Sequence, residues 1–394
     1  MLIMLGIKKS EILIATLVST LFGFLYYLFF PLLSLYFTEL GIGEEMLGII
    51  FAFFPLVIII VSPVVGMLSD DVGRKRIIYF GILAQLLGVI LYLWPPSLAS
   101  IIIARVLAGI AWSMVGLITL AKVEDKLKHQ ERGSKAGVFL SFTEAGALVG
   151  SLVGPFLAGI FFIRFPFLIS AIGLALLLIW LVLWRSHHKP IIKKQDFNPL
   201  CALKKFWKEK KLRAMAFIGI SMHTRIPVMS IFVPLLVIEF GAGYKEVGIL
   251  FALRGVMALL QGVAGKIVDK KGSRNIVIIS VIVASILFIL AGFTRSYIAL
   301  LIVLVAEGLA LAFWNISAWT FMSEIGERKK MEGMVLGSYN SLARFGYLIF
   351  SIISGFIAVA FGTGSLFIIV GIIALVTVLA FSPMLASKFK VPNR

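Results

Sequence analysis

The sequence is poor in the residues that several common classes of protein depend on. It has one cysteine, Cys201, among 394 residues, which excludes a disulfide scaffold. Charged residues make up 14% of the chain, whereas they make up about 25% of a typical soluble domain. Intrinsic disorder is excluded too, because disordered chains lack apolar and aromatic residues and 60% of this chain is hydrophobic.

Motifs for enzymatic chemistry are also missing from the sequence. No G-x-x-x-x-G-K-[ST] stretch occurs, so no ATP site is indicated. No cysteine and histidine residues have metal-ligand spacing, and His187 and His188 form an isolated pair in a loop. No nucleophile motif of a hydrolase or kinase is found. We therefore expect no enzyme, no metal and no cofactor, and any energy must come from an ion or substrate gradient.

Long apolar runs dominate the rest of the chain. A helix needs about 20 apolar residues to cross a bilayer, and the runs predict an all-α membrane protein with twelve spans. The first run is about twice as long as a signal-peptide core and is predicted to remain as a span. The predicted limits are 12–38, 47–68, 77–94, 98–120, 136–162, 165–184, 214–238, 247–268, 275–293, 297–322, 334–361 and 366–386.

The basic residues indicate how these spans are oriented. The net charge of +18 is compatible with a nucleic-acid binder, but the lysines and arginines lie in short clusters between apolar runs, so no nucleic-acid partner is expected. With twelve spans, 30 of the 37 basic residues fall on one side of the membrane and three on the other. This positive-inside pattern predicts a multi-pass protein of the cell membrane with both termini in the cytoplasm.

A basic segment divides the chain into two halves. The predicted domains are 1–184 and 214–394, joined by a cytoplasmic linker, 185–213. Residues 199–213 predict an amphipathic helix at the membrane surface, with a plain solvated linker as the alternative. Its apolar face would hold Leu200, Leu203, Phe206 and Trp207.

The two halves repeat each other at a shift of about 200 residues. Duplicated halves around a midplane site are typical of secondary transporters, in which one half moves against the other. The matching positions are Pro31-Leu32-Leu33 with Pro234-Leu235-Leu236, Asp70-x-x-Gly73-x-Lys75 with Asp269-x-x-Gly272-x-Arg274, Ala104-Arg105 with Ala306-Glu307, and Trp112 with Trp314.

Three motifs resemble those of the major facilitator superfamily. Residues 66–76 read GMLSDDVGRKR and match the G-x-L-x-D-x-x-G-R-K-R loop between helices two and three of that family. Arg105-x-x-x-Gly109 is similar to its helix-four motif. Gly150-x-x-x-Gly154-Pro155 resembles the glycine–proline motif of its drug:proton antiporters. The resemblance implies two pseudo-symmetric six-helix bundles, alternating access and a monomer.

The first of these motifs also implies a conformational latch. In the family this loop holds helix two against helix eleven in the outward-open state. The resemblance assigns that role to Asp70, with Arg74 pairing to Glu124 or Asp125; a positive-inside anchor is the alternative. The second-half loop has Gly-Ser at 272–273 and departs from the motif. The predicted latch residues are Gly66, Asp70, Gly73, Arg74 and Asp269.

Small residues in helix five predict close helix packing. Gly146, Gly150 and Gly154 recur every four residues and are followed by Pro155. Such spacing lets two membrane helices approach closely. The resemblance implies that this stripe meets helix eight, where Ala258, Gly262 and Gly265 form a matching surface.

Ionisable residues inside the spans are the candidate functional groups, because charges in lipid are costly and mark functional paths. We predict that Glu144 and Glu307 carry the coupling protons, since an apolar site disfavours a charged carboxylate, and that Arg105 tunes Glu144. The alternative is that Glu144–Arg105 and Glu307–Arg344 are static pairs. The predicted substrate cavity is lined by Trp112, Arg225, Arg254, Gln261, Trp314, Asn315, Asn340 and Arg344.

These residues favour proton-coupled export of amphipathic organic compounds of the multidrug type. The expected partners are a small-molecule substrate, protons and membrane lipids. The spans contain four arginines and two glutamates, which favours an organic-anion antiporter or importer as the alternative. A non-transporting membrane sensor is a third possibility, but it would need neither paired latch loops nor charges in both halves.

Overall fold

The protein is built from helices throughout the part of the chain that the structure, a computed structural model, describes: residues 10–94, 96–124, 132–184, 204, 206–328 and 331–386. The prediction of an all-α fold is confirmed. Eleven helical segments are long and apolar enough to cross a membrane. The eighth predicted span consists of two shorter helices, α12 (Tyr244–Leu259) and α13 (Gln261–Lys271), which meet at Leu260. Together with this broken segment, the described residues account for the twelve predicted spans.

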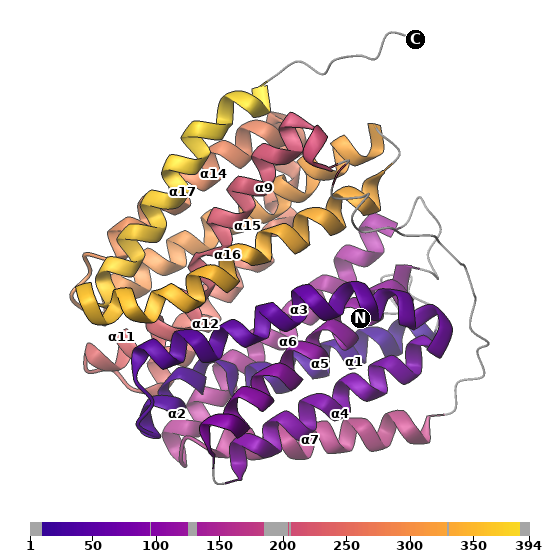
Figure 1. The fold of residues 1–394 in the computed structure, drawn as a ribbon, viewed down its shortest axis with the longest axis vertical. Helices are drawn as coiled ribbons and strands as arrows, with labels where there is room; N and C mark the ends of the chain where they lie inside the picture. The colour runs from indigo at the N-terminus through magenta and orange to yellow at the C-terminus, as the bar shows by residue number, and fades with distance from the viewer. Residues whose placement is uncertain are drawn as a thin grey trace. The chain divides into compact units, whose positions relative to one another are not determined.

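The described helices follow the predicted spans closely (Figure 1). The first half contains α1 (Ser10–Tyr27), the 3-10 turn η1 (Phe30–Leu32), α2 (Leu33–Glu39), α3 (Glu44–Val72), α4 (Arg74–Leu93), α5 (Leu98–Glu124), α6 (Arg132–Ile160) and α7 (Phe165–Leu183). Before α12, the second half contains α9 (Lys210–His223), α10 (Arg225–Pro227), the π-helix η3 (Val228–Phe232) and α11 (Val233–Glu239). After α13 come α14 (Ser273–Ala291), α15 (Tyr297–Arg328), α16 (Glu332–Phe361) and α17 (Thr363–Ala386).

The chain packs as two compact units. One unit comprises Met1–Gln195 and Ser230–Gly255, and the other comprises Asp196–Met229 and Val256–Arg394. Residues 199–203 and 205 of the predicted linker helix, which include Leu200 and Leu203, lie outside the described residues. Phe206 is fully buried in the hydrophobic core of the second unit. The domain limits expected from the sequence stay predictions.

The internal repeat is visible in the helix packing. In the first unit α4 packs against α5 and α7, and α1 packs against α6. In the second unit α14 packs against α15 and α17, and α9 packs against α16. The turns repeat as well: Gly41 and Gly241 have φ of 80° and 79°, and Gly73 and Gly272 have φ of 95° and 84°. These positive φ values favour glycine. The two glycines of the first pair lie 200 residues apart, and those of the second pair lie 199 residues apart.

The glycine stripe of α6 packs against α1, so the expectation that this stripe faces helix eight was wrong, although α6 does meet α12 of helix eight through Leu148 and Pro155. A Cβ at Gly146 would lie 2.4 Å from the carbonyl oxygen of Thr20, and a Cβ at Gly154 would lie 1.6 Å from that of Leu28. The same arrangement recurs in the second unit, where a Cβ at Gly346 would lie 1.9 Å from the carbonyl oxygen of Ile220. Small-residue spacing identifies a close contact but not which helix makes it.

Candidate functional site

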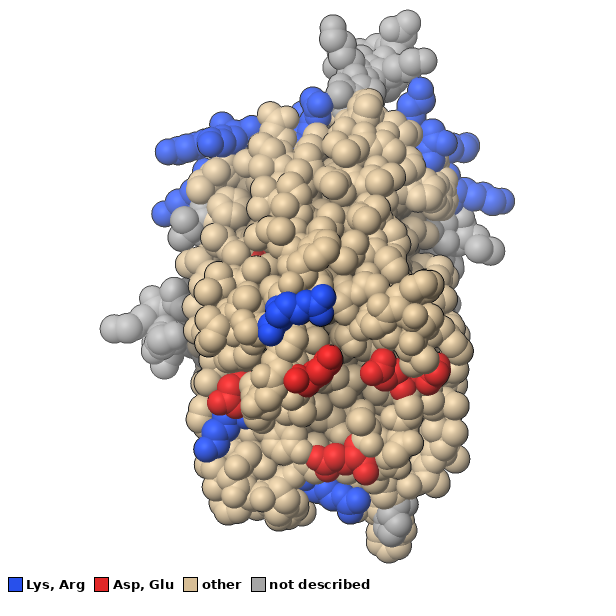
Figure 2. Space-filling model, turned by 90° about the vertical axis from the view of Figure 1, so that its left-hand side faces the viewer, with Lys and Arg blue, Asp and Glu red and all other residues tan. Residues whose placement is uncertain are grey.

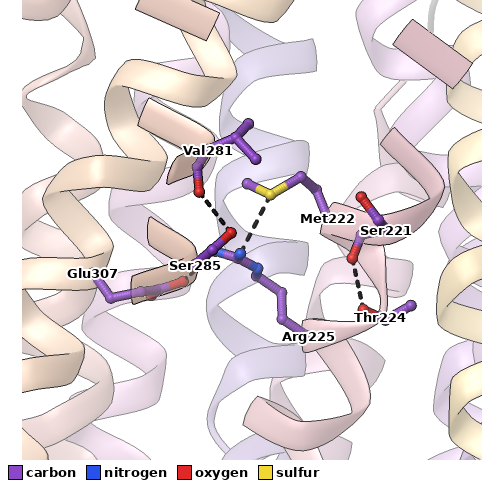
Figure 3. Close-up of polar contacts among 7 residues, drawn as sticks. All are labelled: Ser221, Met222, Thr224, Arg225, Val281, Ser285 and Glu307. Carbon is purple, nitrogen blue, oxygen red and sulfur yellow. Dashed lines mark hydrogen bonds and ion pairs between the residues drawn. The ribbon is translucent and has the colours of Figure 1, made fainter. Parts of the chain in front are cut away.

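A buried ion pair lies among the membrane-spanning helices of the second unit (Figure 3). Arg225 Nη1 donates to Glu307 Oε1 at 2.6 Å. Arg225 and Glu307 have side-chain exposures of 3% and 0%. Arg225 Nη2 lies 3.3 Å from Met222 Sδ, and the guanidinium lies 5.2 Å from the ring centre of Phe288. An Arg–Glu contact of this kind stabilises the ionised carboxylate and offsets part of the cost of burying both charges.

An irregular stretch of the seventh predicted span, which runs from α9 to α11 and is called helix seven below, positions Arg225. The amide of Thr224 and its hydroxyl both donate to the carbonyl oxygen of Ser221, at 3.3 and 2.6 Å, which tightens the end of α9. Pro227 has no amide hydrogen to give to the preceding turn, and the chain continues as a π-helix over Val228–Phe232. π-helical segments often mark functional positions. Arg225 therefore lies where the regular α-helical hydrogen bonding is interrupted.

The sequence predicted Arg225 and Glu307 as functional residues but did not predict that they pair. The alternative expectation had joined Glu307 to Arg344, which lies on α16 and is partly exposed. In the structure Glu307 instead pairs with Arg225. The difference arises because Arg225, Glu307 and Arg344 lie on three different helices, and which arginine meets Glu307 depends on how those helices pack.

Arg105 occupies the matching position in the first unit. Its side chain is fully buried on α5, and its guanidinium lies 4.5 and 4.9 Å from the ring centres of Phe51 and Phe54. Arg105 aligns with Glu307 in the internal repeat, so the two units carry opposite charges at equivalent places. Cation–π contacts of this type stabilise a buried guanidinium.

Trp112 belongs to an aromatic cluster that sequence reasoning missed, hereafter the Trp112 cluster: Phe22, Tyr26, Tyr27, Phe54 and Trp112. The ring centre of Trp112 lies 5.1 to 6.3 Å from those of the other four. Phe22 and Tyr26 are buried, whereas Tyr27 and Trp112 are partly exposed. The run FGFLYYLFF at 22–30 was the available signal. The cluster provides the kind of ring surface that binds aromatic or cationic ligands.

Glu144 lies on a face of α6 different from the glycine stripe. Its side chain is exposed. Further along α6, Leu148 and Pro155 contact α12. A Cβ added to Gly255 of α12 would lie 3.4 Å from Leu148, and a Cβ added to Gly248 would lie 3.1 Å from Pro155. Residues four and eleven positions apart share a helix face. The face of α6 that carries Glu144 is therefore the one that meets α12 further along the helix.

The other predicted cavity residues differ in their exposure. Trp314 is 3% exposed and packs in the hydrophobic core of the second unit. Its neighbour Asn315 is exposed. In the first unit Arg254 is partly exposed, and in the second unit so are Gln261 and Asn340. The exposed and partly exposed positions are compatible with ligand contact, whereas Trp314 is a core residue. The role of all these residues in the cavity stays a prediction.

The predicted latch is only partly described. The side chains of residues 66–72, including Gly66 and Asp70, and that of Glu124 lie outside the described part of the structure, as does Asp125. Gly73 ends α3 and begins α4 with φ 95° and ψ 131°. Arg74 is the first residue of α4, and Asp269 is exposed on α13. The latch role of these residues stays a prediction.

Acidic side chains gather at the helix ends opposite the basic loops, on the face shown in Figure 2. Glu44 lies close enough to Glu239 and Glu45 for electrostatic repulsion. The phenol of Tyr244 donates a hydrogen bond to Glu39, joining α12 to α2 within the first unit. Burial and this contact raise the pKa of Tyr244 to about 12. The phenol therefore remains a donor through the physiological range.

We expect the stabilising effect of Tyr244 to vanish at high pH. A group whose pKa is raised on folding contributes its full share of folding stability below its pKa in the unfolded state, which is about 10 for tyrosine. That contribution is lost as the pH rises to about 12. The difference in melting temperature between the wild type and Tyr244→Phe should be constant from pH 7 to about 9 and should shrink above about 10. In a Glu39→Gln background the loss should be smaller and should be complete at lower pH, because Glu39 helps to raise the pKa of Tyr244 in the folded state. A pH-independent difference would contradict the contact.

Comparisons with known proteins identify the family. The family model described as "Major Facilitator Superfamily" matches residues 15–330 and 228–392. The chain belongs to the major facilitator superfamily. It is therefore a membrane transporter for small molecules rather than an enzyme. Among the residues that the structure describes, no three histidine, cysteine, aspartate or glutamate side chains group closely enough to hold a metal.

The transporter is similar to several proteins with low sequence identity. An "Uncharacterized MFS-type transporter" of Methanocaldococcus jannaschii is 24% identical over 87% of this chain and 92% of its own length. "Multidrug resistance protein MdtG" of Dickeya zeae is 28% identical over 73% of each chain. "Tetracycline resistance protein, class H" of Pasteurella multocida is 26% identical over 59% of this chain and 60% of its own.

Solved structures match the fold of this transporter. The nucleoside transporter NupG has a TM-score of 0.79 and 16% identity, with 96% of this chain and all of the other covered. A D-xylose-proton symporter has a TM-score of 0.74 and 17% identity, with 94% and 96% covered. At these identities the likeness supports the fold alone.

Proposed function

We propose that the transporter exports amphipathic organic compounds in exchange for protons. The observation that carries this proposal is the Arg225–Glu307 pair, fully buried in the membrane-spanning helices at the irregular part of helix seven. In this proposal a rearrangement of the helix separates the Glu307 carboxylate from Arg225, and the carboxylate exchanges the arginine for a proton. Glu144 is the second proposed proton carrier. Arg105 lies on the neighbouring helix and is proposed to tune it.

The Trp112 cluster supports the substrate class. Partly exposed rings of Tyr27 and Trp112 offer an apolar surface, and Glu144 lies on α6, which packs against the same helix, α1. A carboxylate and aromatic rings on helices that pack together suit a compound with an apolar body and a positive group. Two of the similar proteins are named for multidrug and tetracycline resistance. We assign this transporter to the cell membrane, as a monomer with cytoplasmic termini and the loop latch described above.

Transport of an organic anion is the second candidate. With Glu307 paired to Arg225, the remaining intramembrane charges are Arg105, Arg254, Arg344 and Glu144. This leaves a net charge of +2, which an anionic substrate would offset.

A ligand screen on the purified transporter tests these two candidates. Melting temperature is measured with matched sets of cationic, neutral and anionic amphipathic compounds. Export of multidrug type predicts stabilisation by several unrelated cationic or neutral compounds, and protonophore-sensitive differences in their accumulation between expressing and empty cells. Stabilisation by anionic compounds alone would favour the second candidate, and accumulation that a protonophore leaves unchanged would contradict proton coupling.

A further inference from the structure

Two lysines and two tryptophans meet at the basic end of the first unit. Lys75 lies in the first turn of α4 and Lys122 in the last turn of α5. Trp184 follows the last residue of α7, and its indole stacks on that of Trp180 with ring centres 6.3 Å apart and planes at 8°. We call these four residues the basic indole cluster. They come from three helices that pack together, because α4 contacts both α5 and α7.

Both ammonium groups lie against the same indole. The Nζ atoms of Lys75 and Lys122 are 5.6 and 5.4 Å from the ring centre of Trp184. The two positive charges are therefore no more than about 11 Å apart, roughly one Debye length at 0.1 M salt, so each raises the potential felt by the other. An anion beside Trp184 would be attracted by both charges at once.

The helix end at Trp184 fixes one of the two lysines. The Lys75 ammonium donates a hydrogen bond to the carbonyl oxygen of Trp184, one of the carbonyls that lack a partner at a helix C-terminus. An ammonium has three donors, so this bond holds the group in place while it can still bind an anion. The arrangement is therefore more ordered than a lysine that simply extends into water.

Apolar side chains continue the surface toward the membrane. Ile179, Val182 and Leu183 on the last turns of α7 are 55%, 55% and 74% exposed, and Trp180 is 37% exposed. Tryptophan is enriched at the depth of lipid headgroups, and exposed apolar residues of a membrane helix contact acyl chains. Cations, indoles and apolar surface thus follow one another in the order in which a phospholipid presents its phosphate, glycerol and chains.

We propose that the basic indole cluster binds the phosphate of an anionic phospholipid. The lysines attract the headgroup, Trp184 contacts the glycerol region, and the exposed face of α7 contacts the acyl chains. Basic pockets between membrane helices bind anionic headgroups in this way. A free phosphate ion shares the headgroup chemistry but makes no use of the apolar face, so the lipid is the occupant that fits all of these contacts. This inference does not depend on the proposed substrate or on proton coupling.

Native mass spectrometry of the detergent-solubilised transporter tests this site. The probe is an equimolar mixture of phosphatidylglycerol and phosphatidylcholine with identical acyl chains. The wild type is expected to retain phosphatidylglycerol preferentially. Lys75→Gln and Lys122→Gln are each expected to weaken phosphatidylglycerol binding about fivefold, the loss expected for one basic residue at the membrane surface. Lys75→Arg should retain most of the binding, because it keeps the charge.

A lysine on another helix provides the matched control. Lys270 is exposed in the last turn of α13, also in a basic segment, and Lys270→Gln should leave phosphatidylglycerol binding unchanged. Equal retention of the two lipids by the wild type, or an equal loss in Lys270→Gln, would overturn the site. Displacement of the lipid by inorganic phosphate at matched concentration would also overturn it, because the site would then bind a free anion.

Discussion

Replacing Arg225 with methionine is expected to lower the free energy of unfolding by about 3–5 kcal/mol, because it leaves the Glu307 carboxylate buried without its cation. Both side chains of the pair are buried, with exposures of 3% for Arg225 and 0% for Glu307. The double variant Arg225→Met/Glu307→Met removes both charges and keeps similar volumes, so it should recover most of this loss. Denaturant titration of the purified protein in detergent measures all three free energies.

An arginine outside the spans is the matched control for this experiment. Arg295 is exposed, and Arg295→Met should change the free energy of unfolding by no more than about 0.5 kcal/mol. If the double variant were no more stable than Arg225→Met, the loss would not come from the unpaired carboxylate, and the energetic role assigned to the pair would be wrong.

Replacing Gly154 with alanine is expected to destabilise the transporter by about 3 kcal/mol, at the upper end of the usual cost of overpacking. The new Cβ would lie 1.6 Å from the carbonyl oxygen of Leu28 and 2.4 Å from its carbon. Because both are backbone atoms, a rotamer change cannot relieve the clash, and α1 and α6 must separate. Gly346→Ala should have a comparable effect, because its Cβ would lie 1.9 Å from the carbonyl oxygen of Ile220.

Another helical glycine provides the control for this substitution. A Cβ at Gly337 on α16 would meet nothing within 4 Å. Gly337→Ala should therefore be neutral or stabilising, since alanine has the better helix propensity. Melting temperatures of the three purified variants suffice for the comparison. Equal effects at Gly154 and Gly337 would show that α1 and α6 do not approach as closely as described.

The fold could be predicted from the sequence because lipid imposes simple rules. Apolar runs predicted the spans, and the repeat at about 200 residues predicted the matching loop glycines Gly73 and Gly272, whose φ values are 95° and 84°. The broken eighth span was not foreseen, since hydropathy continues through Leu260 although the helix does not. Proline in helix seven was visible in the sequence, but the π-helix that follows it depends on packing.

The candidate site was predictable only in part. The cost of charge in lipid identified Arg225 and Glu307 as candidate functional residues. It did not identify them as partners, because they lie on different helices and the helix that carries Arg225 is irregular between Thr224 and Phe232. Similarly, Trp112 was identified from its place in the repeat, whereas Phe22 and Phe54 join it only after three helices have packed. Contacts between distant residues require the tertiary structure.

Proton flux in proteoliposomes tests the central claim that Glu144 and Glu307 couple substrate movement to protons. The measurement uses a compound that stabilises the purified transporter, and records the pH inside the vesicles as the compound is added. We expect substrate-driven flux in the wild type. We expect the same flux in the control variant Glu327→Gln, whose exposed carboxylate lies on the same helix as Glu307. Glu144→Gln, Glu307→Gln and the double variant Arg225→Met/Glu307→Met are predicted to fall toward the background of empty vesicles. Undiminished flux in both single glutamine variants would contradict the account.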